Sequence, residues 1–382
     1  MALYSTTRRI LLSCMFLSAI FVPESYAKCA FEAVFNFGDS NSDTGGFFYA
    51  FPSQPSPNGV TYFKRPTGRT TDGRLHLDFL TQALGLPFLS PYLQSIGSDY
   101  KHGVNFATSA SPVIQPNISL FVNGVSPFYL DVQINQMKHF KAKVEEFKSH
   151  GKTNLPQPDI FGKALYTIWI GQHDITYDIV GVGAANIKQY EPQIASGIAN
   201  AVKELYRLGG RTFFVLNLAP IGCYGAVLTQ VSHDNSDIDP SGCMISFNNA
   251  VREYNSVLKE TLQQTRQELH DANVIYIDAH SVILELYQNP TAHGLQHGIT
   301  ACCGYGGGNY NFHPKVFCGN TNEVDGQKVT ATACDDPQNY VSWDGIHLTE
   351  SANKILANAI ISGSNNEPSF NLNQFCDIQP IG

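Results

Sequence analysis

A short apolar run near the N-terminus of the chain ends in a turn rich in glycine, aspartate and serine. The run covers residues 33–37, and the turn after it has the sequence GDSNSDTGG at positions 38–46. The run is typical of a β-strand, and the cluster after it predicts a sharp turn into a helix. Ser40 therefore lies at the carboxyl end of a strand, where open α/β sheets bind their ligands. The N–H groups of a helix start there would also favour a developing negative charge.

An acid and an imidazole stand three residues apart near the opposite end of the chain, in the sequence SWDGIH at positions 342–347. Residues i and i+3 lie side by side in a tight turn or a first helical turn, so Asp344 is able to hold one ring nitrogen of His347. The other ring nitrogen is then available to Ser40, because a serine hydroxyl is a poor nucleophile until a base takes its proton.

Two simpler explanations compete with this arrangement. A serine that only caps a helix would explain the turn equally well, but it would not explain the distant Asp-x-x-His. Asp278 is a rival acid because it follows another apolar run, at 274–277. The spacing to His347 favours Asp344.

Six sequence blocks, in order, resemble those of the plant-type GDSL esterase/lipase family of the SGNH hydrolase superfamily. They are GDSNSDTGG (38–46), VNFA (104–107), IGQHD (170–174), LAPIGC (218–223), CCGYGG (302–307) and DGIH (344–347). The resemblance implies an α/β fold, a three-layer sandwich around a central parallel sheet of the flavodoxin-like SGNH hydrolase type. It also implies a secreted serine esterase or lipase that hydrolyses carboxylic esters through an acyl-enzyme on Ser40, with Asp344 and His347 as the other catalytic residues.

The chain departs from this family in two blocks that would form the oxyanion hole. The family has Asn-Phe-Ala-Ser-Gly-Gly where this chain has NFATSA at 105–110, so Ser109 and Ala110 replace both glycines. A backbone N–H of Ser109 or Ala110 would still donate, beside that of Ser40, if neither position requires a glycine-only conformation. The family also has Gly-x-Asn-Asp where His173 replaces the asparagine. An imidazole N–H is able to donate to an oxyanion, and the alternative is that His173 only fills space.

Short apolar runs alternate with helical patterns along the chain. The predicted strands are 33–37, 104–107, 164–170, 212–218 and 274–277, and the predicted helices are 75–84, 194–208 and 247–269. Runs that are continuously apolar are expected of strands buried on both faces of a parallel sheet. Strands that alternate with helices indicate an α/β sandwich with right-handed crossovers. The segment 291–339 has little periodicity and is expected to be an excursion pinned by disulfides.

The first 27 residues have the pattern of a signal peptide. Arg8 and Arg9 precede an apolar stretch at 10–22, and a small-x-small site follows at 25–27. That stretch of 13 residues is short of the roughly 20 that span a membrane, and no later segment approaches that length. We therefore expect residues 1–27 to be removed and residues 28–382 to form a single domain. The expected destination is the extracellular space, the apoplast in a plant, with the vacuole as an alternative.

Removal of Cys14 with the signal peptide leaves an even number of cysteines. The eight are Cys29, Cys223, Cys243, Cys302, Cys303, Cys318, Cys334 and Cys376. An even number in a secreted chain predicts disulfides, but eight cysteines allow 105 pairings. A zinc site of Cys302, Cys303, Cys318 and His313 is the alternative, and the adjacent cysteines and an oxidising compartment disfavour it.

The charge of the chain argues against nucleic acid as a partner. The formal net charge is −8, and it is −9 without residues 1–27, with no basic stripe of the kind that binds nucleic acid. The sequon at Asn117 predicts one N-glycan. The expected partner is a small-molecule or lipid ester, and the chemistry requires neither a metal nor an organic cofactor.

Two other functions remain open. One is an acyltransferase that passes the same acyl group to an alcohol or a sugar acid, and the other is a catalytically weak binding protein. The aromatic stretch FFYAF at 47–51, just beyond Ser40, also has two interpretations. It either lines an acyl or aromatic pocket or packs into the core.

Overall fold

A six-stranded sheet forms the centre of the computed structural model, which describes residues 29–116, 126–148 and 154–382. The strand order is β10-β5-β4-β3-β1-β2. The strands are β1 (Ala33–Gly38), β2 (Gly103–Asn105), β3 (Ala164–Trp169), β4 (Thr212–Leu216), β5 (Asn273–Ile277) and β10 (Asn366–Glu367). The first five are parallel, and β10 is antiparallel to β5 at the edge. Each of the five predicted strands is present, within one to two residues of its expected bounds.

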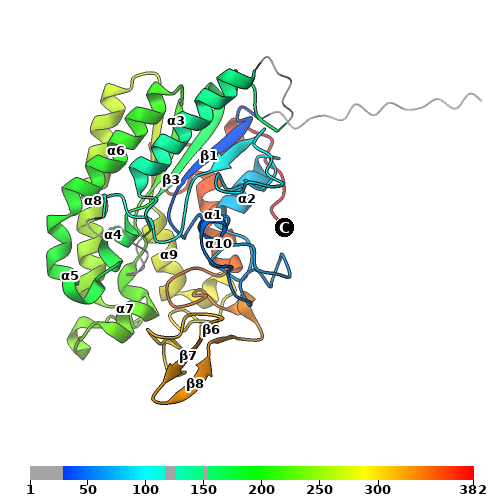
Figure 1. Ribbon diagram of the computed structural model, residues 1–382. Helices are drawn as coiled ribbons and strands as arrows, with labels where there is room; N and C mark the ends of the chain where they lie inside the picture. The colour runs from blue at the N-terminus through cyan, green and yellow to red at the C-terminus, as the bar shows by residue number, and fades with distance from the viewer. Residues whose placement is uncertain (1–28, 117–125, 149–153) are drawn as a thin grey trace, which may run out of the picture.

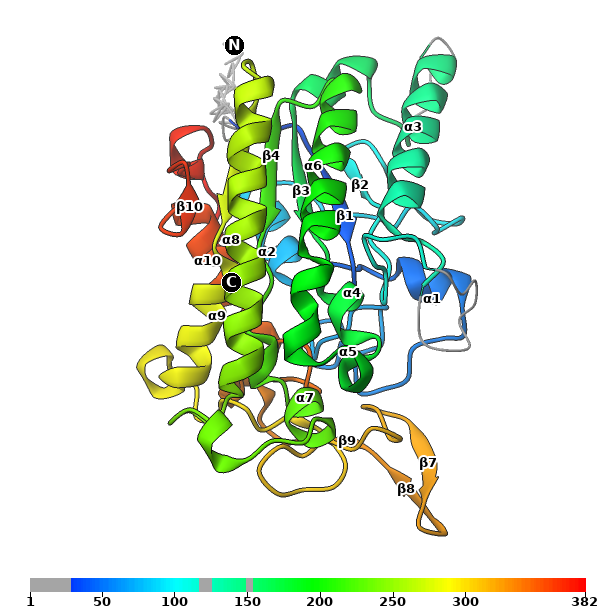
Figure 2. The ribbon, with the colours of Figure 1, turned by 90° about the vertical axis from the view of Figure 1, so that its left-hand side faces the viewer.

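Helices cover both faces of the sheet and make a three-layer sandwich (Figures 1 and 2). One layer holds α3 (Leu130–Phe147), α6 (Glu191–Arg207) and α8 (Ile245–Glu268), and the other holds α2 (His76–Ala83), α9 (Ala279–Gln288) and α10 (Glu350–Ser362). In α6 the buried side chains include Ile194, Ile198, Val202 and Leu205, a helical spacing that buries one face. Every residue of the central strands β1, β3 and β4 is buried, as expected of a sheet covered on both sides.

Four short helices follow strands or turns near the carboxyl edge of the sheet. They are α1 (Gly46–Ala50), α4 (Gln172–Thr176), α5 (Ile179–Asn186) and α7 (Gly225–Gln230). Beyond them, the segment 291–339 extends to one end of the molecule, at the bottom of Figures 1 and 2. It contains the short pair β6 (Cys303–Gly304) and β9 (Thr332–Ala333), and the hairpin β7 (Thr321–Val324) and β8 (Gln327–Thr330), which the sequence did not predict.

All eight cysteines expected in the mature chain form disulfides. The pairs are Cys29–Cys376, Cys223–Cys243, Cys302–Cys334 and Cys303–Cys318. The last two pin the excursion, as expected, and they occupy the three thiols that a zinc site would need. Within the described residues, no group of three or more histidine, cysteine or acidic side chains is placed to hold a metal ion.

The remaining expectations have different outcomes. The sheet is not wholly parallel, because β10 pairs antiparallel with β5 through only two residues. The signal peptide and the sequon at Asn117 lie outside the described residues. None of the helices in the described part of the chain is long and apolar enough to cross a membrane.

Candidate active site

The turn that carries Ser40 begins where β1 ends, at Gly38. The side chain of Gln133 in α3 holds this position, since its Oε1 accepts from Gly38 N–H and its Nε2 donates to Gly38 C=O, each at 2.9 Å. A Cβ atom at Gly38 would collide with the carbonyl oxygen of Trp169 on β3. Glycine is therefore required for the chain to leave the strand at this point.

Two buried asparagines fix the turn after Ser40. Asn36 on β1 donates from Nδ2 to the hydroxyl of Ser42 at 3.0 Å. Asn105 on β2 donates to the carbonyl of Ser42 at 2.7 Å and to the hydroxyl of Thr44 at 2.9 Å. The two amides also bond to each other, at 2.8 Å. Buried polar groups are satisfied by such contacts, and here they tie the turn to two neighbouring strands.

The helix start expected at Ser40 lies further along the chain. Helix α1 begins at Gly46, and its first N–H groups are taken by Asp43, which accepts from Gly45 at 2.7 Å and Gly46 at 2.6 Å. The expectation of a helix N-terminus beside Ser40 was wrong, because residues 41–45 lie between Ser40 and the first residue of α1. The N–H groups of α1 stabilise Asp43 and are not available to a substrate.

Ser40, His347 and Asp344 form one hydrogen-bonded chain. His347 Nε2 lies 2.7 Å from Ser40 Oγ, and His347 Nδ1 lies 2.8 Å from Asp344 Oδ2. The other carboxylate oxygen of Asp344 accepts the backbone N–H groups of Ile346, at 3.0 Å, and His347, at 2.8 Å. The carboxylate is thus fixed by its own turn, and the ring presents one nitrogen to the serine, the arrangement expected of a nucleophile, a base and an orienting acid.

The segment around Asp344 is supported from behind. The indole N–H of the fully buried Trp343 donates to Asn58 Oδ1 at 2.9 Å, and its backbone carbonyl accepts from Cys303 at 2.6 Å. Trp343 packs against both disulfides of the excursion, through Cys302, Cys303 and Cys318. The excursion therefore contributes to the position of the acid and the base.

The contact between Asp344 and His347 outweighs their burial. Burial raises the pKa of Asp344, but the charge and hydrogen bonds of His347 lower it further, so the net shift is below its ordinary value. Burial lowers the pKa of His347, but the charge and hydrogen bond of Asp344, with a contribution from the charge of Asp39, leave it above its ordinary value. Burial also raises the pKa of Asp39 itself, to about 6, against the hydrogen bonds of Asn41. These carboxylates strengthen His347 as a proton acceptor.

The rival acid, Asp278, has a different partner. It is the N-cap of α9, where it accepts from the backbone of Ser281 at 3.0 Å and from the Ser281 hydroxyl at 2.6 Å. It also accepts from Asn217 Nδ2 at 2.9 Å. These bonds describe a capping carboxylate.

The candidate backbone donors for an oxyanion differ in availability. Ser109 donates its N–H to Asp43 Oδ2 at 2.8 Å, and its hydroxyl reaches the same oxygen at 3.1 Å. The N–H groups of Ser40 and Ala110 have no acceptor within the described part of the chain. Ala110 has a positive φ of 63°, in the region where glycine is usual. Of the two positions left open by the sequence, Ala110 is the one whose N–H is available.

His173 is the second residue of α4, directly after β3. Its neighbours anchor this helix to the rest of the site. Gln172 Oε1 accepts from Asn41 Nδ2 at 3.2 Å and from the hydroxyl of Tyr224 at 2.8 Å. Asp174 accepts the N–H groups of residues 113 and 114, at 2.7 and 2.8 Å, and burial raises its pKa to about 7. The half-buried ring of His173 lies 6.5 Å from that of Tyr177.

Several residues that shape this site were not singled out from the sequence. Asn36 gave a usable signal, since it is a polar residue inside an otherwise apolar buried strand. Gln133 and Gln172 gave none, because a glutamine on a helix is ordinary until its partner is known.

Comparisons with known proteins identify the family to which the chain is similar. The family model described as GDSL-like Lipase/Acylhydrolase matches residues 34–360. A protein of Arabidopsis thaliana named as a GDSL esterase/lipase is 57% identical over 353 residues, which cover 92% of each chain. Another Arabidopsis thaliana protein, named Alpha-L-fucosidase 3, is 41% identical over 347 residues, 89% of this chain and 93% of the other. Among solved structures, a catalytic mutant of an acetylxylan esterase from Geobacillus stearothermophilus matches with 14% identity and a TM-score of 0.37, covering 86% of this chain and 92% of the other.

Proposed function

The chain belongs to the GDSL-like lipase/acylhydrolase family of carboxylic ester hydrolases, and on that premise we propose that Ser40 is its nucleophile. His347 is the general base, and Asp344 orients it. The observation that carries the proposal is the pair of hydrogen bonds that join the three side chains, 2.7 Å from His347 to Ser40 and 2.8 Å from His347 to Asp344.

The reaction takes place in two halves. In the first, His347 Nε2 takes the proton of Ser40 as Oγ forms a bond to the ester carbonyl carbon. When the tetrahedral intermediate collapses, the carbon–oxygen bond to the alcohol breaks and His347 returns the proton to the leaving alkoxide. In the second half, water replaces serine as the nucleophile, His347 takes its proton, and the acid leaves as Ser40 is regenerated.

The oxyanion of each tetrahedral intermediate needs donors. We assign two of them to the backbone N–H groups of Ser40 and Ala110, which have no acceptor within the described residues. The third position belongs to His173, at the site where the family has an asparagine. Preorganised donors of this kind contribute on the order of 10²–10³ each to turnover.

The relative named as a fucosidase raises a different chemistry for comparison. Most glycosidases use two carboxyl groups, one on each side of the bond that they cleave. Here Asp344 is committed to His347, and its second oxygen to two backbone N–H groups, so it is not free to act as a glycosidic acid. The site therefore supports ester cleavage rather than glycoside cleavage.

Secretion is part of the proposal. The N-terminal 27 residues have the signal-peptide pattern. The four disulfides support the same destination, because such bonds form and persist in oxidising compartments.

Pre-steady-state kinetics with p-nitrophenyl acetate tests the mechanism. When hydrolysis of the acyl-enzyme is much slower than its formation, an acyl-enzyme on Ser40 predicts a burst of p-nitrophenol equal to the enzyme concentration, which Ser40→Ala abolishes. Ser256→Ala, which alters an exposed serine in α8, serves as the matched control and should keep the full burst. A burst that survives in Ser40→Ala would reject the nucleophile.

The same acyl-enzyme also separates hydrolysis from acyl transfer. Added alcohols and sugar acids at millimolar concentration are offered to it, and the products are separated. Hydrolysis predicts the free acid as the main product. A dominant ester of one acceptor would instead identify a transferase.

A further inference from the structure

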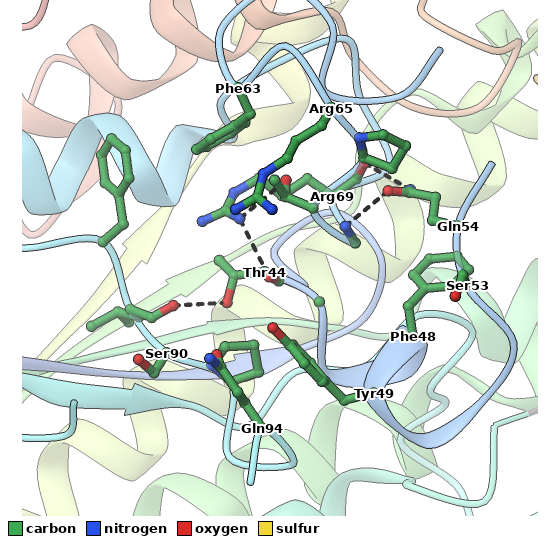
Figure 3. A pocket seen from close by; sticks show the side chains of 17 residues that line it. Thr44, Phe48, Tyr49, Ser53, Gln54, Phe63, Arg65, Arg69, Ser90 and Gln94 are labelled. Atoms are coloured by element: carbon green, nitrogen blue, oxygen red, sulfur yellow. Dashed lines mark hydrogen bonds between the residues drawn. The ribbon is translucent and has the colours of Figure 1, made fainter. Parts of the chain in front are cut away.

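A cavity of about 410 Å³ lies beside the turn that carries Ser40 (Figure 3). Its walls come from the start of α1, from residues 63–69 and from residues 88–94, whereas Ser40, Asp344 and His347 do not line it. The volume is within the range of about 300–1,000 Å³ that is typical of small-molecule sites. The cavity is therefore large enough for a small molecule, and the reacting groups do not form its walls.

Aromatic rings form two walls of this cavity. Phe48 and Tyr49 come from α1, and Figure 3 shows both below the arginines. Phe63 and Phe88 form another part, with their ring centroids 6.0 Å apart and their planes at 72°. The side chain of Tyr49 is large and apolar, yet 55% of its surface is exposed to solvent. The aromatic stretch after the nucleophile thus contributes Phe48 and Tyr49 to a cavity, which the sequence alone left undecided.

The charges around the cavity are unbalanced. Among the residues that the structure describes, no aspartate or glutamate lines the cavity, in a chain whose net charge is −8. Of its two arginines, Arg69 is neutralised by a two-pronged pair with the buried Asp78, at 2.7 Å for each bond. The guanidinium of Arg69 also lies 4.6 Å from the centre of the Phe63 ring, which fixes it in the wall.

Arg65 is the other cation, and its charge is available. It is exposed and has no hydrogen bond or ion pair with any part of the chain that the structure describes. A guanidinium presents a planar set of donors that matches a carboxylate, and aromatic walls favour a flat apolar body. Other polar atoms of the lining are already engaged, since Gln54 donates to Arg69 C=O at 2.8 Å and accepts from Gly68 N–H at 2.9 Å.

We propose that this cavity, which we call the arginine–aromatic cavity, binds a small aromatic carboxylate. The ring of the ligand lies against the aromatic walls, and its carboxylate pairs with Arg65. The site is independent of the proposed catalytic function, because none of its lining residues belongs to the catalytic chain of hydrogen bonds.

Calorimetric titration of the full chain with benzoate tests this proposal. Benzamide has the same shape without the charge, and cyclohexanecarboxylate has the charge without the flat ring. We expect benzoate to bind at least fivefold more tightly than either. Glucuronate, a sugar carboxylate, is titrated as the alternative ligand and is expected to bind more weakly than benzoate.

Variants assign the binding to this cavity. Arg65→Gln should weaken benzoate binding at least tenfold, and Tyr49→Ala should weaken it severalfold. Lys64→Gln removes the neighbouring exposed cation, which does not line the cavity, and should leave the affinity within twofold. Ser40→Ala should bind benzoate as the parent does, whether or not Ser40 is the nucleophile.

Three results would overturn the proposal. The first is an affinity for benzoate that does not change in Arg65→Gln. The second is benzamide or glucuronate that binds as tightly as benzoate. The third is loss of benzoate binding in Ser40→Ala, which would place benzoate at the reacting groups instead. Circular dichroism of Arg65→Gln and Tyr49→Ala, both exposed positions, checks that a lost affinity is not lost folding.

Discussion

The two halves of the proposed active site are built in different ways. On the acid–base side, Asp344 and His347 belong to one turn of four residues. Both carboxylate oxygens of Asp344 and both ring nitrogens of His347 have hydrogen-bond partners at 2.7–3.0 Å. On the oxyanion side, the candidate donors come from three segments, at Ser40, Ala110 and His173, which only the sheet brings to the same edge.

This difference predicts that the acid–base residues tolerate substitution less well than the oxyanion residues. In the proposed mechanism the acid–base groups act as a unit, so the loss of one is expected to remove most of the catalysis. Oxyanion donors share one developing charge, so the loss of one leaves the others in place. This side also carries the substitutions at Ser109, Ala110 and His173. Changes on the acid–base side should therefore cost more turnover than changes on the oxyanion side.

The largest effect is expected from His347→Ala. It removes the base, and by analogy with other serine enzymes kcat should fall by about 10⁴–10⁶. Steady-state kinetics on a p-nitrophenyl ester measures this, with His102→Ala at an exposed position as the control. A loss of less than tenfold would mean that another group serves as the base.

Asp344→Asn should cost less, about 10²–10⁴ in kcat, because the imidazole survives but loses the partner that sets its tautomer. The matched variant Asp278→Asn alters the N-cap of α9 and should keep kcat within about twofold, since asparagine also caps helices. If Asp278→Asn were the more damaging of the two, the assignment of the acid would be incorrect.

On the oxyanion side, His173→Ala should lower kcat by about 10²-fold, with a smaller change in KM, because the hydrogen bond strengthens as charge develops. His173→Asn restores the family's donor and should keep or raise kcat. Equal kcat and KM in the parent and His173→Ala would show that the ring only fills space.

A smaller effect is expected in the pH profile. His347 must be neutral to accept a proton, so kcat/KM rises as the pH increases through its pKa. Because the charge of Asp39 raises that pKa, Asp39→Asn should move the acidic limb of the profile to lower pH. A limb that stays in place, or moves to higher pH, would contradict a contribution of Asp39.

The smallest effect concerns Ala110. An L-residue at a φ of 63° is strained relative to glycine, so Ala110→Gly should raise the free energy of unfolding by about 1 kcal/mol. Its N–H remains, and kcat should change less than twofold. Chemical denaturation measures the first quantity, and a destabilised variant would show that the methyl group contributes more than the strain costs.

Local patterns in the sequence predicted much of this molecule. The buried strands appear within two residues of their expected bounds because continuous apolar runs are a strong signal. Asp344 and His347 were predicted to meet because they are only three positions apart in the chain. Their contact with Ser40 was predicted because a serine nucleophile needs a base and a group that orients the base. The catalytic roles of the three residues remain predictions.

What the sequence did not predict depends on contacts between distant segments. The two-residue strand β10 pairs with β5 without any apolar run of its own. The engagement of Ser109 by Asp43 depends on two loops that follow different strands. The pairing of eight cysteines was one choice among 105. Each of these needs the fold before it has a meaning.

Covalent trapping is the most direct test of the central claim, that Ser40 is the serine which His347 and Asp344 activate. The purified protein is treated with a serine-directed phosphonate, digested, and mapped by mass spectrometry. We expect one phosphonate per chain, on the peptide that contains Ser40, and no label in Ser40→Ala or His347→Ala. A label on another serine, or undiminished labelling of Ser40→Ala, would contradict the account.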